Sequence, residues 1–182
     1  MRKIIVRGPA MSRSGYGEQT RFALRCLKAS NMYDIYIINT EWGKTSMIPE
    51  DTEETRWIEL NLIKTQKIFE ASKQKKEQPK FDVSLQVTIP NEWEMLAPIN
   101  IGYTAGIETD KVAPVWIEKA NMMDKIIVTS NHAKYGFVNT VYQGQDPQGN
   151  PVTLKLDSGK PIKVVNYAVR EVEKLDLDID FE

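Results

Sequence analysis

The feature that most constrains the fold of this chain is an alternation of short apolar runs with segments of helical periodicity. Six apolar runs have the length and composition of buried strands: Lys3 to Arg7, Asp34 to Asn39, Phe81 to Val87, Ile99 to Tyr103, Lys125 to Thr129 and Ile162 to Val165. Between these runs, apolar residues recur at helical spacing and predict helices from about Phe22 to about Ser30, from Glu53 to Lys76, from Val112 to Met122 and from Asn131 to Asn139. Parallel neighbouring strands need such crossover connections, so the alternation predicts an α/β fold with a mostly parallel sheet flanked by helices.

Two segments depart from this alternation. Turn-forming residues fill 146–151, and Val152 to Leu156 alternates apolar with polar side chains, so we predict a small β-hairpin inserted near 143–160. The end of the chain, Leu175 to Phe181, also alternates strictly, which fits an exposed strand, a pairing edge or an acidic tail. We favour the tail, and we expect one domain over 1–169 followed by 170–182 as a tail or the start of a linker.

The second long helix and the single cysteine give two further expectations. Ile58, Leu62 and Phe69, with Leu60 and Ile63 beside them, predict an apolar stripe on the helix that ends before Pro79. Its basic end, 73–76, is typical of a solvated last turn rather than of an anion site. Cys26 excludes an internal disulfide and a zinc cluster of several thiolates, and we expect it to be a buried, inert thiol.

Composition narrows the class of protein. The 182 residues are 41% hydrophobic and 27% charged, as in an ordinary globular protein, and fit one domain with a sizeable core. A net charge of -1 argues against a broad nucleic-acid surface, because phosphate neutralisation needs clustered Lys and Arg. No apolar run approaches the roughly 18 residues of a membrane span, and the first residues lack the apolar length of a secretory signal. We therefore expect a cytoplasmic protein with no membrane span.

The first candidate site follows the first strand. Gly15, Tyr16 and Gly17 lie where a loop leads into a helix, whose unpaired N–H groups and positive end would face an anion or a sugar near a phosphate. The alternative is that the glycines only permit a tight turn.

A second candidate site follows the fourth strand, where Glu108, Thr109 and Asp110 form a short acidic loop. A carboxylate at the end of a strand can hydrogen-bond sugar hydroxyls, or act as a base if burial raises its pKa. The alternative is that Thr109 or Asp110 caps the helix that Pro114 helps to start.

Two more polar groups complete the candidates. Asn91, Glu92 and Trp93 follow Pro90 and fit either a polar wall with an aromatic platform for sugars or the start of a helix. Ser130, Asn131 and His132 follow the fifth strand; Ser130 or Asn131 is a natural N-cap, and His132, the only histidine, fits an exposed first turn or a site residue. No nucleophile and base pair stands out by spacing, so the catalytic residues stay unknown, and no acidic cluster has the pattern of a metal site.

Together these motifs resemble a known family. Gly15-Tyr-Gly17, Ile89-Pro-Asn-Glu-Trp93, Gly102-Tyr103 with Glu108-Thr-Asp110, Trp116, and Asp124 to Ser130 with Phe137 are similar, in order and spacing, to the N-terminal half of GT-B glycosyltransferases of the family 4, or group 1, type. The resemblance spans about residues 1–169. It implies a Rossmann-like domain, and transfer of a sugar from a nucleotide-sugar co-substrate to an acceptor hydroxyl. We expect no cofactor beyond this co-substrate and no metal.

The resemblance also implies that sugar transfer requires a second domain. In this family the N-terminal domain mostly holds the acceptor and a second domain mostly holds the donor nucleotide. Nothing in the sequence corresponds to that second domain, so we expect half of a glycosyltransferase, inactive alone, which pairs with a donor-binding domain or chain or forms a homo-oligomer through its exposed face. The alternatives are a non-catalytic carbohydrate-binding module and a nucleotide-binding module.

Overall fold

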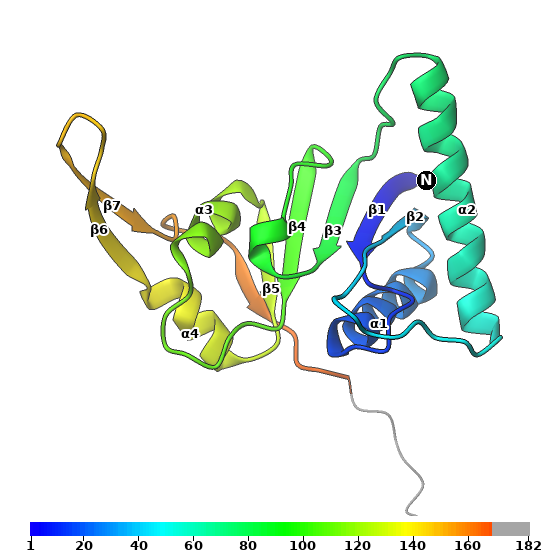
Figure 1. Cartoon of the computed structure of the whole chain (residues 1–182), viewed down its shortest axis with the longest axis horizontal. Coiled ribbons are helices and arrows are strands. Elements are labelled where there is room, and N and C mark those ends of the chain that lie inside the picture. Colours follow the sequence, from blue (N-terminus) through cyan, green and yellow to red (C-terminus); the bar gives the residue numbers. More distant parts are fainter. Residues whose placement is uncertain (169–182) are drawn as a thin grey trace, which may run out of the picture.

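The computed structural model describes residues 1–168, which form a Rossmann-like α/β fold with a small antiparallel hairpin (Figure 1). The strands are β1 (Arg2–Gly8), β2 (Tyr33–Asn39), β3 (Val83–Val87), β4 (Ile99–Thr104), β5 (Lys125–Val128), β6 (Val141–Gln145), β7 (Pro151–Lys155) and β8 (Ile162–Val164). The helices are α1 (Gly15–Ser30), α2 (Glu53–Gln74), α3 (Pro114–Met122) and α4 (Asn131–Asn139), and a 3-10 turn, η1, spans Pro90–Glu92. The predicted acidic tail lies outside the described residues.

The main sheet has six strands in the order β2-β1-β3-β4-β5-β8, and every neighbouring pair in it is parallel. The predicted parallel sheet is therefore confirmed. The chain first moves outward from β1 to β2 and then returns past β1 to β3. In open parallel sheets such a reversal of strand order opens a crevice at the carboxyl ends of the strands, here between β1 and β3.

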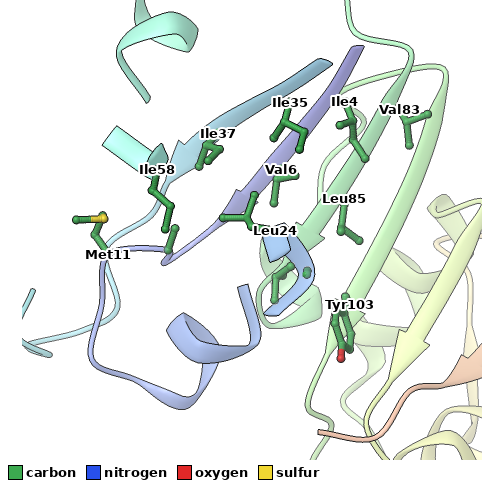
Figure 2. Packing of buried hydrophobic residues seen from close by; sticks show 13 residues of the cluster. Ile4, Val6, Met11, Leu24, Ile35, Ile37, Ile58, Val83, Leu85 and Tyr103 are labelled. Atoms are coloured by element: carbon green, nitrogen blue, oxygen red, sulfur yellow. The ribbon is translucent and has the colours of Figure 1, made fainter. Parts of the chain in front are cut away.

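Helices cover the two faces of the sheet unequally. On one face, Leu24 of α1 packs against Val6, Leu85 and Tyr103 (Figure 2), and we call this the α1 face. On the other, α3 and α4 pack against β5 and β8 through a separate cluster that contains Ile117, Ile126, Phe137 and Ile162, and we call this the α3/α4 face. Successive residues of a strand point to opposite faces of the sheet. The apolar runs therefore contribute side chains to the cores on both the α1 face and the α3/α4 face.

Helix α2 straddles the β2 edge of the sheet instead of covering a face. Ile58 packs into the core of the α1 face, whereas Ile68 packs on the other side. The N–H of Ile37 donates to Oγ1 of Thr65 at 2.8 Å, so a helix side chain satisfies the backbone of the edge strand. The predicted apolar stripe is wrong for Leu60 and Ile63, which are 66% and 50% exposed, because a helix on a sheet edge buries only a narrow strip.

The predicted hairpin is confirmed as β6 and β7, which pair antiparallel and extend away from the sheet (Figure 1). The Tyr142 hydroxyl anchors its base by donating to the carbonyl of Val112 at 2.8 Å. The expectation that Cys26 is a buried thiol is wrong, because this residue is exposed. It lies two residues beyond Leu24, about 200° around the helix from that buried side chain. Over the described residues, no helix has the length and apolar character needed to cross a membrane.

Candidate functional site

The candidate site is the edge where the parallel strands end, and contacts there connect the loops that follow three strands. The Tyr16 hydroxyl lies 2.8 Å from Oγ1 of Thr104 and accepts a hydrogen bond from the N–H of Ala105 at 3.1 Å. The hydroxyl of Thr129 donates to the carbonyl of Ala105 at 2.8 Å. Residues after β1, β4 and β5 therefore form one continuous rim, which we call the carboxyl rim.

Tyr16 brings an aromatic surface to this rim. Its ring lies 4.4 Å from that of Trp42, centroid to centroid, with a tilt of 32°, and both side chains are partly exposed. Burial raises the pKa of the Tyr16 hydroxyl above its usual value, although hydrogen bonds with Thr104 and Ala105 oppose the shift. The phenol is therefore neutral at physiological pH and can both donate and accept. Sequence reasoning missed Trp42, whose only signal was a tryptophan in a turn-rich surface loop.

The acidic loop after β4 lies on the rim beside the start of α4. Glu108, Thr109 and Asp110 are exposed, and the carbonyl of Glu108 lies 3.1 Å from Nε2 of His132. The capping alternative for Thr109 and Asp110 is wrong, because the N-cap of α3 is Ala113. Thr109 instead donates to the carbonyl of Lys111 at 2.8 Å. The two carboxylates of this loop thus face solvent at the rim.

The start of α4 has the predicted cap. Oγ of Ser130 accepts from the N–H of Ala133 at 3.0 Å, so Ser130 is the N-cap. Asn131 and His132 are exposed in the first turn of the helix, at the rim.

The two glycines predicted in the loop that leads into α1, Gly15 and Gly17, have different surroundings. A Cβ on Gly17 would lie 2.1 Å from the carbonyl oxygen of Ser12, so this glycine is required by close packing. Gly15 is exposed, and a Cβ there would meet nothing within 4 Å. Ser14 caps the helix by accepting from the N–H of Gly17 at 3.0 Å. The buried Arg21, also missed by sequence reasoning, holds the loop from below through the carbonyls of Ala10 and Ser12 at 2.7 and 2.9 Å.

The segment after β3 follows the strand that lies between β1 and β4, next to the point where the strand order reverses. Pro90–Glu92 form the single 3-10 turn η1 there, and Trp93 is its C-cap in an extended conformation. Trp93 has an exposed fraction of 0% and lies flat against Gly102, whose added Cβ would approach the indole within 2.5 Å. It is therefore a core residue with no face to offer a sugar. Asn91 is exposed and Glu92 is partly exposed, and the carbonyl of Glu92 accepts from the guanidinium of Arg7.

The rim holds hydrogen-bonding and aromatic groups rather than a metal centre. Within residues 1–168, no group of three or more His, Cys, Asp or Glu side chains is arranged to hold a metal ion. What the rim offers is an aromatic pair, exposed carboxylates, one imidazole and hydroxyls at the end of a parallel sheet.

We compared the chain with protein-family models, with curated proteins and with solved structures, and none of the three comparisons finds a match. The class of protein that the structure defines is therefore a Rossmann-like α/β protein with a polar and aromatic carboxyl rim.

Proposed function

We propose that this chain is the N-terminal, acceptor-side half of a glycosyltransferase that transfers a sugar from a nucleotide-sugar donor to an acceptor hydroxyl. The observation that carries the proposal is the convergence of the Tyr16 and Trp42 rings with the Glu108 and His132 loops on one rim. The order of motifs that resembles family 4 glycosyltransferases supports it, because three of those motifs, at residues 15–17, 108–110 and 130, lie in the loops of this rim.

The chemistry of the rim suits an uncharged, polyhydroxylated ligand. Aromatic rings offer flat apolar surfaces on which the C–H faces of a sugar can lie, and carboxylates accept strong hydrogen bonds from hydroxyl groups. The exposed carboxylates of Glu108 and Asp110 would repel a diphosphate at the same place. We therefore assign the acceptor to this rim and the diphosphate of the donor to a second lobe.

This assignment explains why the chain alone should be inactive. Departure of a nucleoside diphosphate requires positive groups or N–H donors that are aimed at the developing charge. In the proposal a second domain or chain supplies them, and the rim binds and orients the acceptor hydroxyl. We assign no catalytic base.

The test is to titrate the purified chain with soluble oligosaccharides, nucleotide sugars and free nucleotides by calorimetry, with ligand-detected NMR for weak binders. We expect an oligosaccharide to bind without any nucleotide, and Trp42→Ala to weaken it about tenfold. Trp57→Ala, a change of another partly exposed tryptophan that lies on α2, is the matched control and should leave the affinity unchanged.

The other outcomes separate the alternatives. Turnover of a nucleotide sugar by the chain alone would refute the assignment of the donor site to a second lobe. Tight binding of free nucleotide without any saccharide binding would favour a nucleotide-binding module. Saccharide binding by a chain that no donor-binding partner activates would leave a non-catalytic carbohydrate-binding module.

A further inference from the structure

Strand β6 has an outer edge whose backbone has no hydrogen-bond partner among residues 1–168. The N–H of Asp146 donates to the carbonyl of Asn150 at 2.9 Å, and in an antiparallel pair every second residue bonds to the opposite strand in this way. By this alternation, Tyr142 and Gly144 direct their backbone groups to β7. The residues beside them direct their N–H and C=O groups outward, and these are Val141, Gln143 and Gln145.

The other strand edges of the described chain are protected against pairing. Along the outer edge of β2, α2 is attached through Thr65, which is hydrogen-bonded to the backbone of the strand. Strand β8, at the opposite edge of the main sheet, has only three residues, one of which is Lys163. Strand β7 begins with Pro151, which has no N–H, and the carbonyl of Lys155 at its end accepts from Asn121 of α3 at 2.9 Å. Short strands, lysine and proline are usual protections of a sheet edge, whereas β6 is five residues long and has neither a charge nor a proline.

We propose that two copies of this chain pair antiparallel through their β6 strands, about a two-fold axis at Gln143. In this arrangement Gln143 lies opposite the partner's Gln143, and Val141 lies opposite the partner's Gln145. The backbone groups that point outward then bond to those of the partner, and the two hairpins form one continuous sheet. This proposal does not depend on the function of the carboxyl rim.

Gly144 supplies a second, independent observation. Glycine weakens the middle of a strand, and where it occurs it often marks the close approach of another backbone. Within this chain, the nearest atom to a Cβ on Gly144 would be Cγ2 of Val152 at 3.8 Å, an ordinary contact, so the packing of the described residues does not require a glycine there. In the proposed pair Gly144 lies opposite the partner's Tyr142, at a position where side chains on antiparallel strands come closest, and its missing side chain leaves room for that ring.

The composition of β6 favours a second copy over an unrelated partner. In a two-fold pair a strand meets its own reversed sequence, and like charges directly opposite one another are destabilising. Strand β6 has no charged side chain, so no like charges meet. Oε1 of Gln143 accepts from Thr153 at 2.8 Å, which leaves the NH2 group of Gln143 free to donate to the partner's Gln143 on the axis. The strand is therefore complementary to itself.

The test is sedimentation equilibrium of the full chain over a range of concentrations. The contact involves one short strand from each copy and is at the small end of specific interfaces, so we expect a reversible dimer with a Kd of about 10–100 μM. Amide exchange at Gln143 should slow as the concentration rises, whereas exchange at Thr153, on the outer edge of β7, should not. A chain that stays monomeric up to about 1 mM would overturn the proposal.

Variants locate the contact. Gln143→Pro removes an outward N–H of β6 and should weaken the dimer by about tenfold or more. Thr153→Pro is the matched control, because Thr153 is the cross-strand partner of Gln143 and directs its N–H to the other edge of the same hairpin, and both variants lose the same side-chain hydrogen bond. The Kd of this control should stay within about twofold of the parent value.

A third variant separates a lost contact from a damaged hairpin. Gln143→Lys keeps the backbone and places two like charges opposite each other on the axis, so it should also weaken the dimer. Thermal unfolding at low concentration checks that all three variants fold. Equal weakening by Gln143→Pro and Thr153→Pro, or a dimer that neither Gln143 variant weakens, would contradict the proposal.

Discussion

At the scale of single residues, the environment of a side chain decides its role more than its position in a motif. Gly15 and Gly17 lie in one short motif, yet only Gly17 is in close contact with the backbone of a preceding turn. Trp93 lies in a polar segment, yet it is buried because Gly102, on the neighbouring strand, leaves room for its ring. The sequence could not predict that pairing, since the two residues belong to different elements.

Gly102→Ala tests this packing. The new methyl group would lie 2.5 Å from the indole of the fully buried Trp93, so we expect a loss of about 1–3 kcal/mol in the free energy of unfolding. The measurement is urea denaturation followed by tryptophan fluorescence. Gly15→Ala is the matched control and should change stability by less than about 1 kcal/mol. A Gly102→Ala protein as stable as the Gly15→Ala control would contradict the packing seen around Trp93.

A second prediction concerns pH. Partial burial opposes ionisation of Asp34, but hydrogen bonds from Tyr36 and Lys64 outweigh it and lower the pKa of this carboxyl. A carboxyl whose pKa is lower in the folded than in the unfolded state stabilises the protein at pH values above its unfolded-state pKa. This stabilisation is lost as the pH falls through the folded-state pKa. Burial and the same contact with Asp34 raise the pKa of Tyr36 to about 12, so its contribution is lost as pH rises above about 10.

The measurement is the pH dependence of the unfolding midpoint. Asp34→Asn should flatten the decline below about pH 4, and Tyr36→Phe should flatten the decline above about pH 10. Asp51→Asn, at an exposed aspartate paired with Arg56, is the control. The assignment fails if Asp34→Asn and the parent protein lose stability in parallel on acidification.

At the scale of elements, existence and type were predictable, but lateral placement was not. The strands and helices follow from apolar runs and helical spacing, and the N-cap at Ser130 follows from residue type. Helix α2 is attached to the edge of β2 through Thr65, a buried polar residue that a hydrophobic pattern reads as a break in the stripe. The carboxyl rim was predictable in part, because parallel strands end at one edge, whereas the Trp42 ring comes from a loop with no periodic signal.

Thr65→Val tests the attachment of α2 to the sheet. Valine keeps the shape of threonine but removes the hydroxyl, which leaves the buried N–H of Ile37 without its acceptor. We expect a loss of about 1–3 kcal/mol in the free energy of unfolding and faster amide exchange at Ile37. Thr45→Val, at an exposed threonine, is the matched control and should stay within about 0.5 kcal/mol of the parent. Unchanged exchange at Ile37 would show that Thr65 does not hold the edge.

At the scale of the whole molecule, the described residues divide into a sheet with its helices, which carries the rim, and a hairpin that extends from it (Figure 1). The sequence predicted both parts but not the strand order, because the order depends on which way each crossover turns. The parallel direction of the strands puts the loops after β1, β4 and β5 on one edge, and the order leaves only β3 between β1 and β4.

The last prediction concerns the hairpin. Gln143 and Thr153 are paired across β6 and β7, so the residues between them can be replaced by Asn-Gly, which favours a two-residue turn. Most of the removed residues are exposed, and Tyr142 and Leu154 at the base are kept, so stability should change by less than about 0.5 kcal/mol. Leu154→Ala is the contrasting variant: its side chain packs on the core of the α3/α4 face, and the loss should be about 1–2 kcal/mol. If shortening the hairpin destabilises the protein more than Leu154→Ala does, the distal hairpin is part of the cooperative fold and not a separable arm.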